Sequence, residues 1–271
     1  MKKPTRLAAR GPRFYGCSAF AAIAVGAVSA TCMPLAWAQS DEEKFQAGGS
    51  QWGLGIAAGM DRKPYREFDD KTIAIPMVTY ENRWVSVAGP SLDLKLPSAG
   101  PVSFRLRARY ASDGYEAEDS PYLAGMEERK ASIWLGGAAI WRNEFANLSA
   151  ELLADASGHS KGTRFKLQAD RRFTSGAFSF TPRLAVHWVD RKYVDYYYGV
   201  RAAEARPDRA RYDGDAAANV ELGLRVDYAV APKQTLFLDL SGTRLGSGIK
   251  NSPLVGRSSQ TGVRVGYLYR F

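Results

Sequence analysis

Cysteine, histidine and long apolar runs are scarce in this chain of 271 residues. The only cysteines are Cys17 and Cys32, and there are two histidines. With so few nitrogen and sulfur ligands we expect no transition-metal site and no cofactor. No run of about 20 uncharged apolar residues follows the N-terminal region, which excludes a helical membrane protein. The classes that remain are a soluble protein and a membrane β-barrel, whose alternating strands average to ordinary hydropathy.

The first 38 residues have the organisation of a secretory signal peptide. Five basic residues and no acidic residue come first, small apolar residues follow, and the segment ends in a small-x-small tripeptide. This order predicts a signal peptide over 1–38, cleaved between Ala38 and Gln39 with Ala36 at the other small position. Cleavage removes both cysteines and lowers the formal charge from +9 to +4. The basic balance is therefore no argument for nucleic-acid binding.

The rest of the chain repeats a period of two. From Val220 to Val230, apolar residues alternate with polar or small ones, and four further stretches show the same pattern. Alternation places the two sets on opposite faces of a β-strand. No stretch of ten residues has a convincing helical period. We therefore predict an all-β chain.

Three features favour a transmembrane barrel over a soluble sandwich. The strands are roughly 10 to 14 residues long, as a tilted membrane crossing requires. Aromatic residues gather near strand ends, where the lipid–water boundary would lie. The polar faces are charged along most of their length, as expected of a wet lumen. The residues predicted to face that lumen are Arg105, Arg107, Arg109, Glu151, Asp155, Arg183, His187, Glu221, Arg225 and Asp227.

The C-terminus ends in an amphipathic strand. Tyr267, Tyr269 and Phe271 lie on one face of it, with Phe271 as the last residue. A terminal strand of this kind resembles the signal that the outer-membrane assembly machinery recognises. Together with the export signal, it predicts a Gram-negative outer-membrane protein in contact with lipid and lipopolysaccharide.

Twelve antiparallel up-and-down strands account for the pattern, with ten as the alternative. Residues 39–50 form a short periplasmic segment and 51–271 the barrel. The alternative arises at Gly89-Pro90, where two short crossings could be one long strand. The expected crossings are 51–60, 71–80, 83–89, 91–97, 102–112, 130–142, 145–156, 163–174, 177–190, 216–230, 233–246 and 259–271. Short turns and long connections then alternate, as in bacterial barrels.

Two loops are candidate functional sites. His159 and Ser160 are adjacent and flanked by glycines. Neighbours on a strand point to opposite faces, so a catalytic pair is disfavoured and no enzymatic activity is expected. In the 191–215 loop, tyrosines precede arginines. Its candidate outer contact residues are Tyr196, Tyr197, Tyr198 and Arg201. They could form a contact surface, or the loop could pack over the barrel mouth.

Short motifs make the chain resemble the MipA/OmpV family of outer-membrane proteins. The motifs are Tyr65 to Pro76, Gly158 to Gly162, Tyr197 to Val200 and Ser252 to Val255. The resemblance implies a non-enzymatic barrel that brings a lytic transglycosylase together with a murein synthase. The residues themselves leave two other functions open, a small pore or solute-binding barrel with an arginine-lined lumen and, less favoured, a barrel lipase or deacylase.

Overall fold

A computed structural model of the chain describes residues 49–68, 70 and 72–271. The predicted signal peptide and its cleavage site at Ala36, Ala38 and Gln39 lie outside these residues. The strands are β1 (Gln51–Arg62), β2 (Thr72–Glu81), β3 (Val85–Ala88), β4 (Ser91–Lys95), β5 (Val102–Ala111), β6 (Ser132–Arg142), β7 (Asn147–Asp155), β8 (Thr163–Asp170), β9 (Phe173–Ser175), β10 (Phe178–Val189), β11 (Ala217–Ala231), β12 (Gln234–Arg244) and β13 (Ser259–Arg270).

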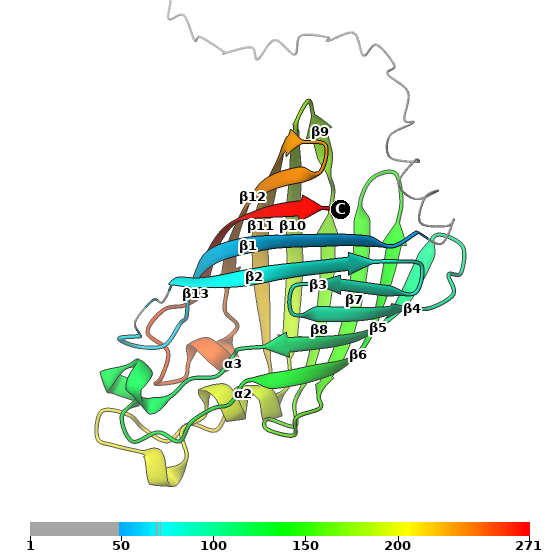
Figure 1. Ribbon diagram of the computed structural model, residues 1–271. Helices are drawn as coiled ribbons and strands as arrows, with labels where there is room; N and C mark the ends of the chain where they lie inside the picture. The colour runs from blue at the N-terminus through cyan, green and yellow to red at the C-terminus, as the bar shows by residue number, and fades with distance from the viewer. Residues whose placement is uncertain (1–48, 69, 71) are drawn as a thin grey trace, which may run out of the picture.

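These strands form one closed antiparallel barrel (Figure 1). Apart from β8 and β9, each strand pairs with its neighbours in sequence, and β13 pairs with β1 to close the sheet. β8 and β9 pair with successive stretches of the same edge of β10, at 183–189 and 178–180. The thirteen strands therefore occupy twelve positions around the barrel. The prediction of twelve is confirmed, and the ten-strand alternative is wrong.

The hairpin of β3 and β4 is shorter than the expected crossings 83–89 and 91–97. Its strands have four and five residues. Gly89 has a φ of +55° and Pro90 follows it, so the chain reverses after Ala88. Glycine adopts this left-handed conformation without a Cβ clash, and proline fixes the next φ. The two short crossings are a real hairpin, but it stops partway along the wall.

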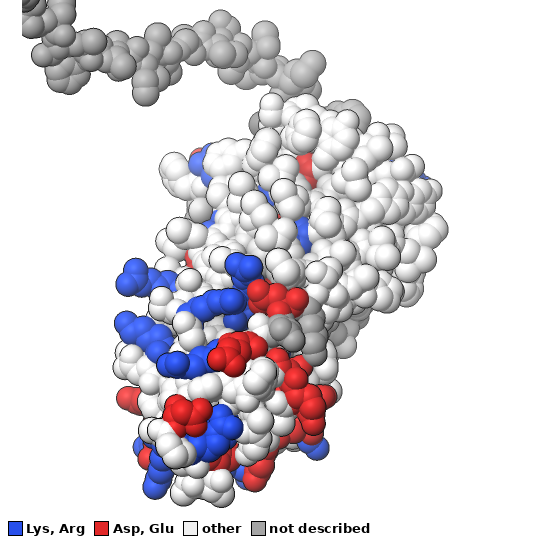
Figure 2. Space-filling view, turned by 90° about the vertical axis from the view of Figure 1, so that its left-hand side faces the viewer, with Lys and Arg blue, Asp and Glu red and all other residues white. Residues whose placement is uncertain are grey.

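Side chains on the two faces of the wall follow the predicted alternation. Leu54, Leu106 and Leu222 point outward and are 50%, 51% and 65% exposed. In the outer membrane this apolar band faces lipid. Figure 2 shows the band as a surface almost without charge, with charged residues gathered at the end that carries the long connections. Long connections mark the extracellular end of bacterial barrels, so the short turns and Phe271 are periplasmic.

Helices occur in the extracellular connections, although the sequence predicted none. α2 (Arg191–Tyr198) begins where the Asp190 side chain accepts a hydrogen bond from the backbone N–H of Tyr193, at 2.9 Å. α3 (Ser247–Lys250) is a single turn. Both are too short for a helical period to emerge from the sequence. Among the described residues, no helix has the length and apolar character needed to cross a membrane.

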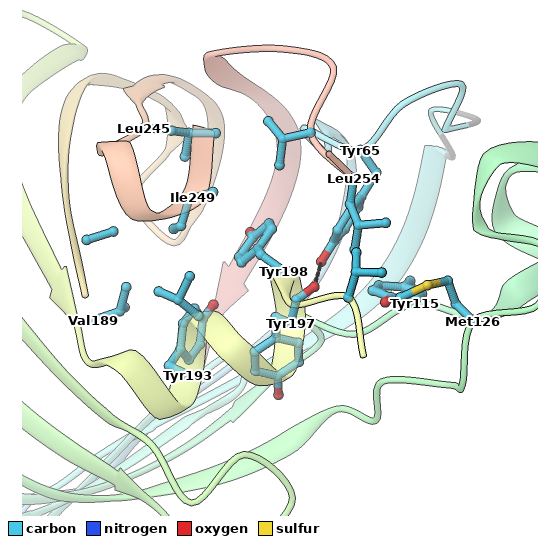
Figure 3. Packing of buried hydrophobic residues seen from close by; sticks show 14 of the residues in the cluster. Tyr65, Tyr115, Met126, Val189, Tyr193, Tyr197, Tyr198, Leu245, Ile249 and Leu254 are labelled. Atoms are coloured by element: carbon cyan, nitrogen blue, oxygen red, sulfur yellow. Dashed lines mark hydrogen bonds between the residues drawn. The ribbon is translucent and has the colours of Figure 1, made fainter. Parts of the chain in front are cut away.

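A cluster of buried apolar side chains lies in the extracellular connections and the strand ends next to them. Tyr65, Val194, Tyr197, Leu254 and their neighbours pack together, supplied by α2, by α3 and by the loops around them (Figure 3). We call this cluster, together with the connections that supply it, the outer cap. Because the outward apolar side chains of the wall face lipid, the cap takes over the role of a hydrophobic core.

Candidate functional site

Arginine and carboxylate side chains alternate up one wall of the lumen. Arg107 donates from Nε to Asp93 Oδ1 at 2.7 Å and from Nη2 to Asp93 Oδ2 at 2.6 Å. Arg107 also pairs with Glu151. Arg105 donates to Asp93 at 3.0 Å, and Arg109 donates to Glu151 at 2.9 Å. Three arginines on one strand face would repel one another, and the carboxylates between them offset that repulsion.

A second network lies on the opposite wall. Arg183 donates from Nε to Glu221 at 2.8 Å, and from Nη1 and Nη2 to Asp239 at 2.8 and 3.0 Å. His187 Nε2 lies 3.0 Å from Glu221 Oε2. Arg264 forms an ion pair with Asp239 at 4.0 Å. Bidentate arginine–carboxylate geometry of this kind fixes both partners, so the wall is rigidly cross-braced.

The remaining predicted lumen residues divide into two cases. Arg225 donates to Asp227 at 2.9 Å, and its guanidinium lies 4.1 Å from the ring centroid of Phe237. These residues do face inward. Asp155 does not line the lumen: its carboxylate accepts from the backbone N–H groups of Ser157, Ser160 and Lys161. It closes the 156–162 loop instead, because it is the last residue of β7.

Sequence reasoning missed Asp93, Asp239 and Arg264. Asp93 and Asp239 are the central carboxylates of the two networks. Both alternate with leucines, at Leu92 and Leu94 and at Leu238 and Leu240. That alternation was the available signal. Their partners could not be read from it, since the strand register decides which side chains meet.

A cavity of about 350 Å³ lies in the lumen beneath the outer cap. Its lining carries seven Lys or Arg side chains and four Asp or Glu side chains. The cations are Arg62, Lys63, Arg109, Arg164, Lys166, Arg183 and Arg264. The carboxylates are Asp61, Asp113, Glu151 and Glu221. Asp70 and Asp239, outside the lining, pair with Arg62 and Arg183, so the cavity keeps a small excess of positive charge that favours an anion.

Tyrosines of the outer cap are buried over the barrel mouth. The hydroxyl of Tyr65 donates to the backbone oxygen of Tyr197 at 3.1 Å, and its ring stacks on Tyr198 with centroids 5.4 Å apart (Figure 3). Burial, together with the nearby Tyr198, raises the pKa of Tyr65 well above 10.0. Burial also raises the pKa of Tyr115 to about 12. These phenols are therefore neutral in the folded cap.

The predicted outer contact residues need a correction. Tyr197 and Tyr198 are 0% and 7% exposed, so they are not available to an outside partner. The alternative in which the loop packs over the barrel mouth describes them. Tyr196 is half-buried, and Arg201 is exposed and pairs with Glu127.

A buried ion pair joins two connections of the cap. Arg129 donates from Nη2 to both carboxylate oxygens of Glu204, at 2.8 and 2.9 Å, and from Nε to the backbone oxygen of Tyr196 at 2.6 Å. Burial opposes ionisation of Glu204, but N–H groups of Arg201 and Glu127 and the guanidinium of Arg129 outweigh it and lower its pKa below 4.5. Sequence reasoning did not single out either partner, which are 75 positions apart.

The His159–Ser160 pair has no catalytic geometry. The hydroxyl of Ser160 donates to Asp155 at 2.8 Å, while His159 Nδ1 lies 2.9 Å from the backbone oxygen of Ala131. That oxygen can only accept, so Nδ1 carries the proton and cannot act as a base towards Ser132, whose hydroxyl is 3.4 Å away. In the part of the chain that the structure describes, no group of three or more His, Cys, Asp or Glu could hold a metal ion.

Known proteins of similar sequence agree with this architecture. Residues 54–271 match the family described as MltA-interacting protein MipA. The MltA-interacting protein of Escherichia coli K12 is 25% identical over 254 residues, which cover 92% of this chain and 98% of that protein. Outer membrane protein OmpV of Vibrio cholerae is 26% identical over 157 residues, covering 58% of this chain and 61% of that protein.

Among solved structures, the NanC porin covers 80% of this chain and 98% of its own, with a TM-score of 0.41 and 11% identity. Family match, barrel architecture and outer-membrane relatives agree. The chain is an outer-membrane β-barrel and belongs to the MltA-interacting protein MipA family.

Proposed function

We propose that this barrel is a non-enzymatic attachment protein that brings a lytic transglycosylase and a murein synthase together at the inner face of the outer membrane. The supporting relative carries the name MltA-interacting protein and aligns over 98% of its own length. The alignment therefore spans nearly the whole of both chains.

The periplasmic rim is the surface best suited to such partners. The outer mouth lies under the packed cap, and the lumen wall is cross-braced by ion pairs. At the rim, Phe145 stands on the turn between β6 and β7 and is 78% exposed. Trp84, on the turn between β2 and β3, is 56% exposed. Exposed aromatics at turns are typical anchors of protein interfaces, and Phe145 is the observation that carries the proposal.

Site-specific photocrosslinking tests this proposal. A photoreactive amino acid replaces Phe145 on the periplasmic turn, and in a matched control it replaces Arg211, an exposed residue of the outer cap. We expect adducts with murein hydrolases or synthases from position 145 only. If position 145 yields only the assembly machinery or lipoproteins common to unrelated barrels, the attachment role is refuted.

The cationic cavity favours a second candidate, a barrel that binds or conducts small anions. This candidate is supported by the lining of the cavity, which carries seven cationic and four anionic side chains. Planar-bilayer recordings distinguish the two. Steady anion-selective conductance that Arg183→Gln alters would favour the pore, whereas its absence alongside crosslinks at Phe145 favours attachment.

A further inference from the structure

The ring of strand pairing is closed, but between β2 and β5 the short hairpin of β3 and β4 spans only the periplasmic part of the wall. β3 pairs only with Thr79–Glu81 of β2, and the hairpin that it forms with β4 ends at Gly89 and Pro90. On the other side, β4 pairs with β5 up to Arg109. Among the described residues, no strand pairs with the outer stretch of β2, from Thr72 to Val78, on the side that faces β5. Figure 1 shows the short hairpin ending well before β2 does.

Backbone groups of β2 are directed into this opening. Phe271 N–H donates to the backbone oxygen of Trp52, so even-numbered residues of β1 direct their backbone groups towards β13. Odd-numbered residues of β1 therefore bond to β2, and the register pairs them with odd-numbered residues of β2. The backbone N–H and C=O groups of Thr72, Ala74 and Val78 consequently point away from β1, towards the opening. The residue between them, Pro76, has no N–H to leave unpaired, and proline is typical of a strand edge. Such an edge does not persist in hydrocarbon unless it meets water or a polar cavity.

The opening is apolar on both faces of β2. Thr79 pairs with inward-facing Gly53, and a Cβ on Gly53 would contact the Thr79 side chain, so Thr79 also faces inward. Ile73, Ile75 and Met77 alternate with Thr79 along β2 and therefore share its inner face. Ile73 and Ile75 are 57% and 54% exposed, whereas other inward apolar side chains such as Phe237 and Leu268 are each 6% exposed. The outer face of the same stretch carries Ala74, Pro76 and Val78. An unbroken apolar surface therefore runs from the lipid side to the lumen side of β2.

Arg109 lies just inside the opening, beside its partner Glu151. Arg109 donates from Nε to the hydroxyl of Ser91, the residue after the tip of the short hairpin, at 3.1 Å. The cationic cavity of about 350 Å³ is lined by Arg109 and reaches both flanks of the opening, at Asp61 beside β2 and at Ser112 after β5. An apolar strand edge beside a cavity with more cations than carboxylates matches an amphiphile with an acyl chain and an anionic headgroup. The cavity is at the small end of ligand pockets, which favours a single chain.

We propose that the wall between β2 and β5 is a lateral opening to the membrane that admits a long-chain carboxylate, with the acyl chain along Ile73 and Ile75 and the headgroup at Arg109. A murein partner plays no part in this binding, so the proposed attachment function and the lateral site stand or fall separately.

Collisional quenching in lipid tests whether the opening exists. In full-length protein with Cys17→Ser and Cys32→Ser, a bimane label is attached through Ile75→Cys. The matched inward control is Ala138→Cys, on a strand paired on both sides, and the lipid-facing reference is Leu106→Cys. With 5-doxylstearic acid in the bilayer, we expect quenching at position 75 to approach that at 106 and to exceed that at 138 at least threefold. Equal quenching at 75 and 138 would overturn the proposal.

The headgroup is tested with the methyl ester of the same probe. The acid should quench position 75 saturably, and the ester should quench it weakly, while both quench position 106 alike. Arg109→Gln should weaken saturable binding of the acid roughly tenfold, since a charge-assisted hydrogen bond is lost. Arg105→Gln, on the same face of β5 and likewise bonded to a carboxylate, does not line the cavity; it is the control and should change binding less than twofold.

Equal quenching at position 75 by acid and ester would overturn carboxylate recognition. The same holds if Arg109→Gln and Arg105→Gln behave alike. The first experiment leaves Arg109 unchanged, so the proposal can be refuted even if the Arg109 variant does not assemble. Unheated electrophoretic mobility of the folded barrel verifies assembly of each variant.

Discussion

Replacement of Arg129 by methionine should open the outer cap without unfolding the barrel. The Arg129 side chain is 1% exposed and Glu204 is 4% exposed, and two hydrogen bonds join them. Methionine fills similar space but leaves the carboxylate without its cation. Removing one partner of a buried ion pair costs about 3–5 kcal/mol.

At about 4 kcal/mol, with 1.4 kcal/mol per tenfold change, the opening equilibrium of the cap rises roughly 700-fold. Native-state hydrogen exchange measures this directly, because local opening sets the exchange rate of cap amides. We expect faster exchange in α2 and at Val200, with the amides of β11 and β12 unchanged. The exposed pair of Arg211 and Asp213 supplies the control, and Arg211→Met should change exchange by less than about threefold.

A double variant separates the lost pair from lost packing. Arg129→Met combined with Glu204→Leu removes both charges, and replacement of a buried pair by apolar residues is often neutral. Its cap should exchange more slowly than that of Arg129→Met alone. If Arg129→Met leaves cap exchange at the wild-type rate, or if the double variant opens further than the single one, the assignment of this pair as the clamp of the cap is refuted.

Three further predictions concern pH, wall packing and assembly. The folded-state pKa of Glu204 is below 4.5, so the stabilisation of the cap by Glu204 is complete above pH 4.5 and is lost as the pH falls further. Buried Tyr65 has a raised pKa, so it stabilises the cap below about pH 10 and ceases to do so as the pH rises. Hydrogen exchange of cap amides, measured against pH, should show both limits. A Cβ on Gly136 would lie 2.0 Å from the backbone oxygen of Leu152, but a Cβ on Gly137 would lie 3.6 Å from its nearest neighbour. Gly136→Ala should therefore lower the free energy of unfolding in urea by about 1–3 kcal/mol, and Gly137→Ala should leave it unchanged. Phe271→Ala should lower the amount of folded protein in outer-membrane fractions severalfold; wild-type levels would refute its role in assembly.

Much of the barrel followed from local pattern. Alternation along Val220–Val230 specified a strand and its two faces, because successive side chains on a strand point in opposite directions. Arg105, Arg107 and Arg109 were assigned to the lumen on that basis, and they lie there. The same reasoning failed at Asp155, since a residue at a strand end can turn to its own loop.

The sequence by itself determined the strands, the order of short and long connections and the sidedness of most wall residues, since each depends on residues close together in the chain. Only the tertiary structure decided the pairing of Arg129 with Glu204, the burial of Tyr197 and Tyr198 and the placement of Asp93 between arginines. Those contacts depend on strand register and on loops that meet far from each other in sequence. The opening beside β2 belongs to the same class, because only the short reach of the β3–β4 hairpin leaves that edge unpaired.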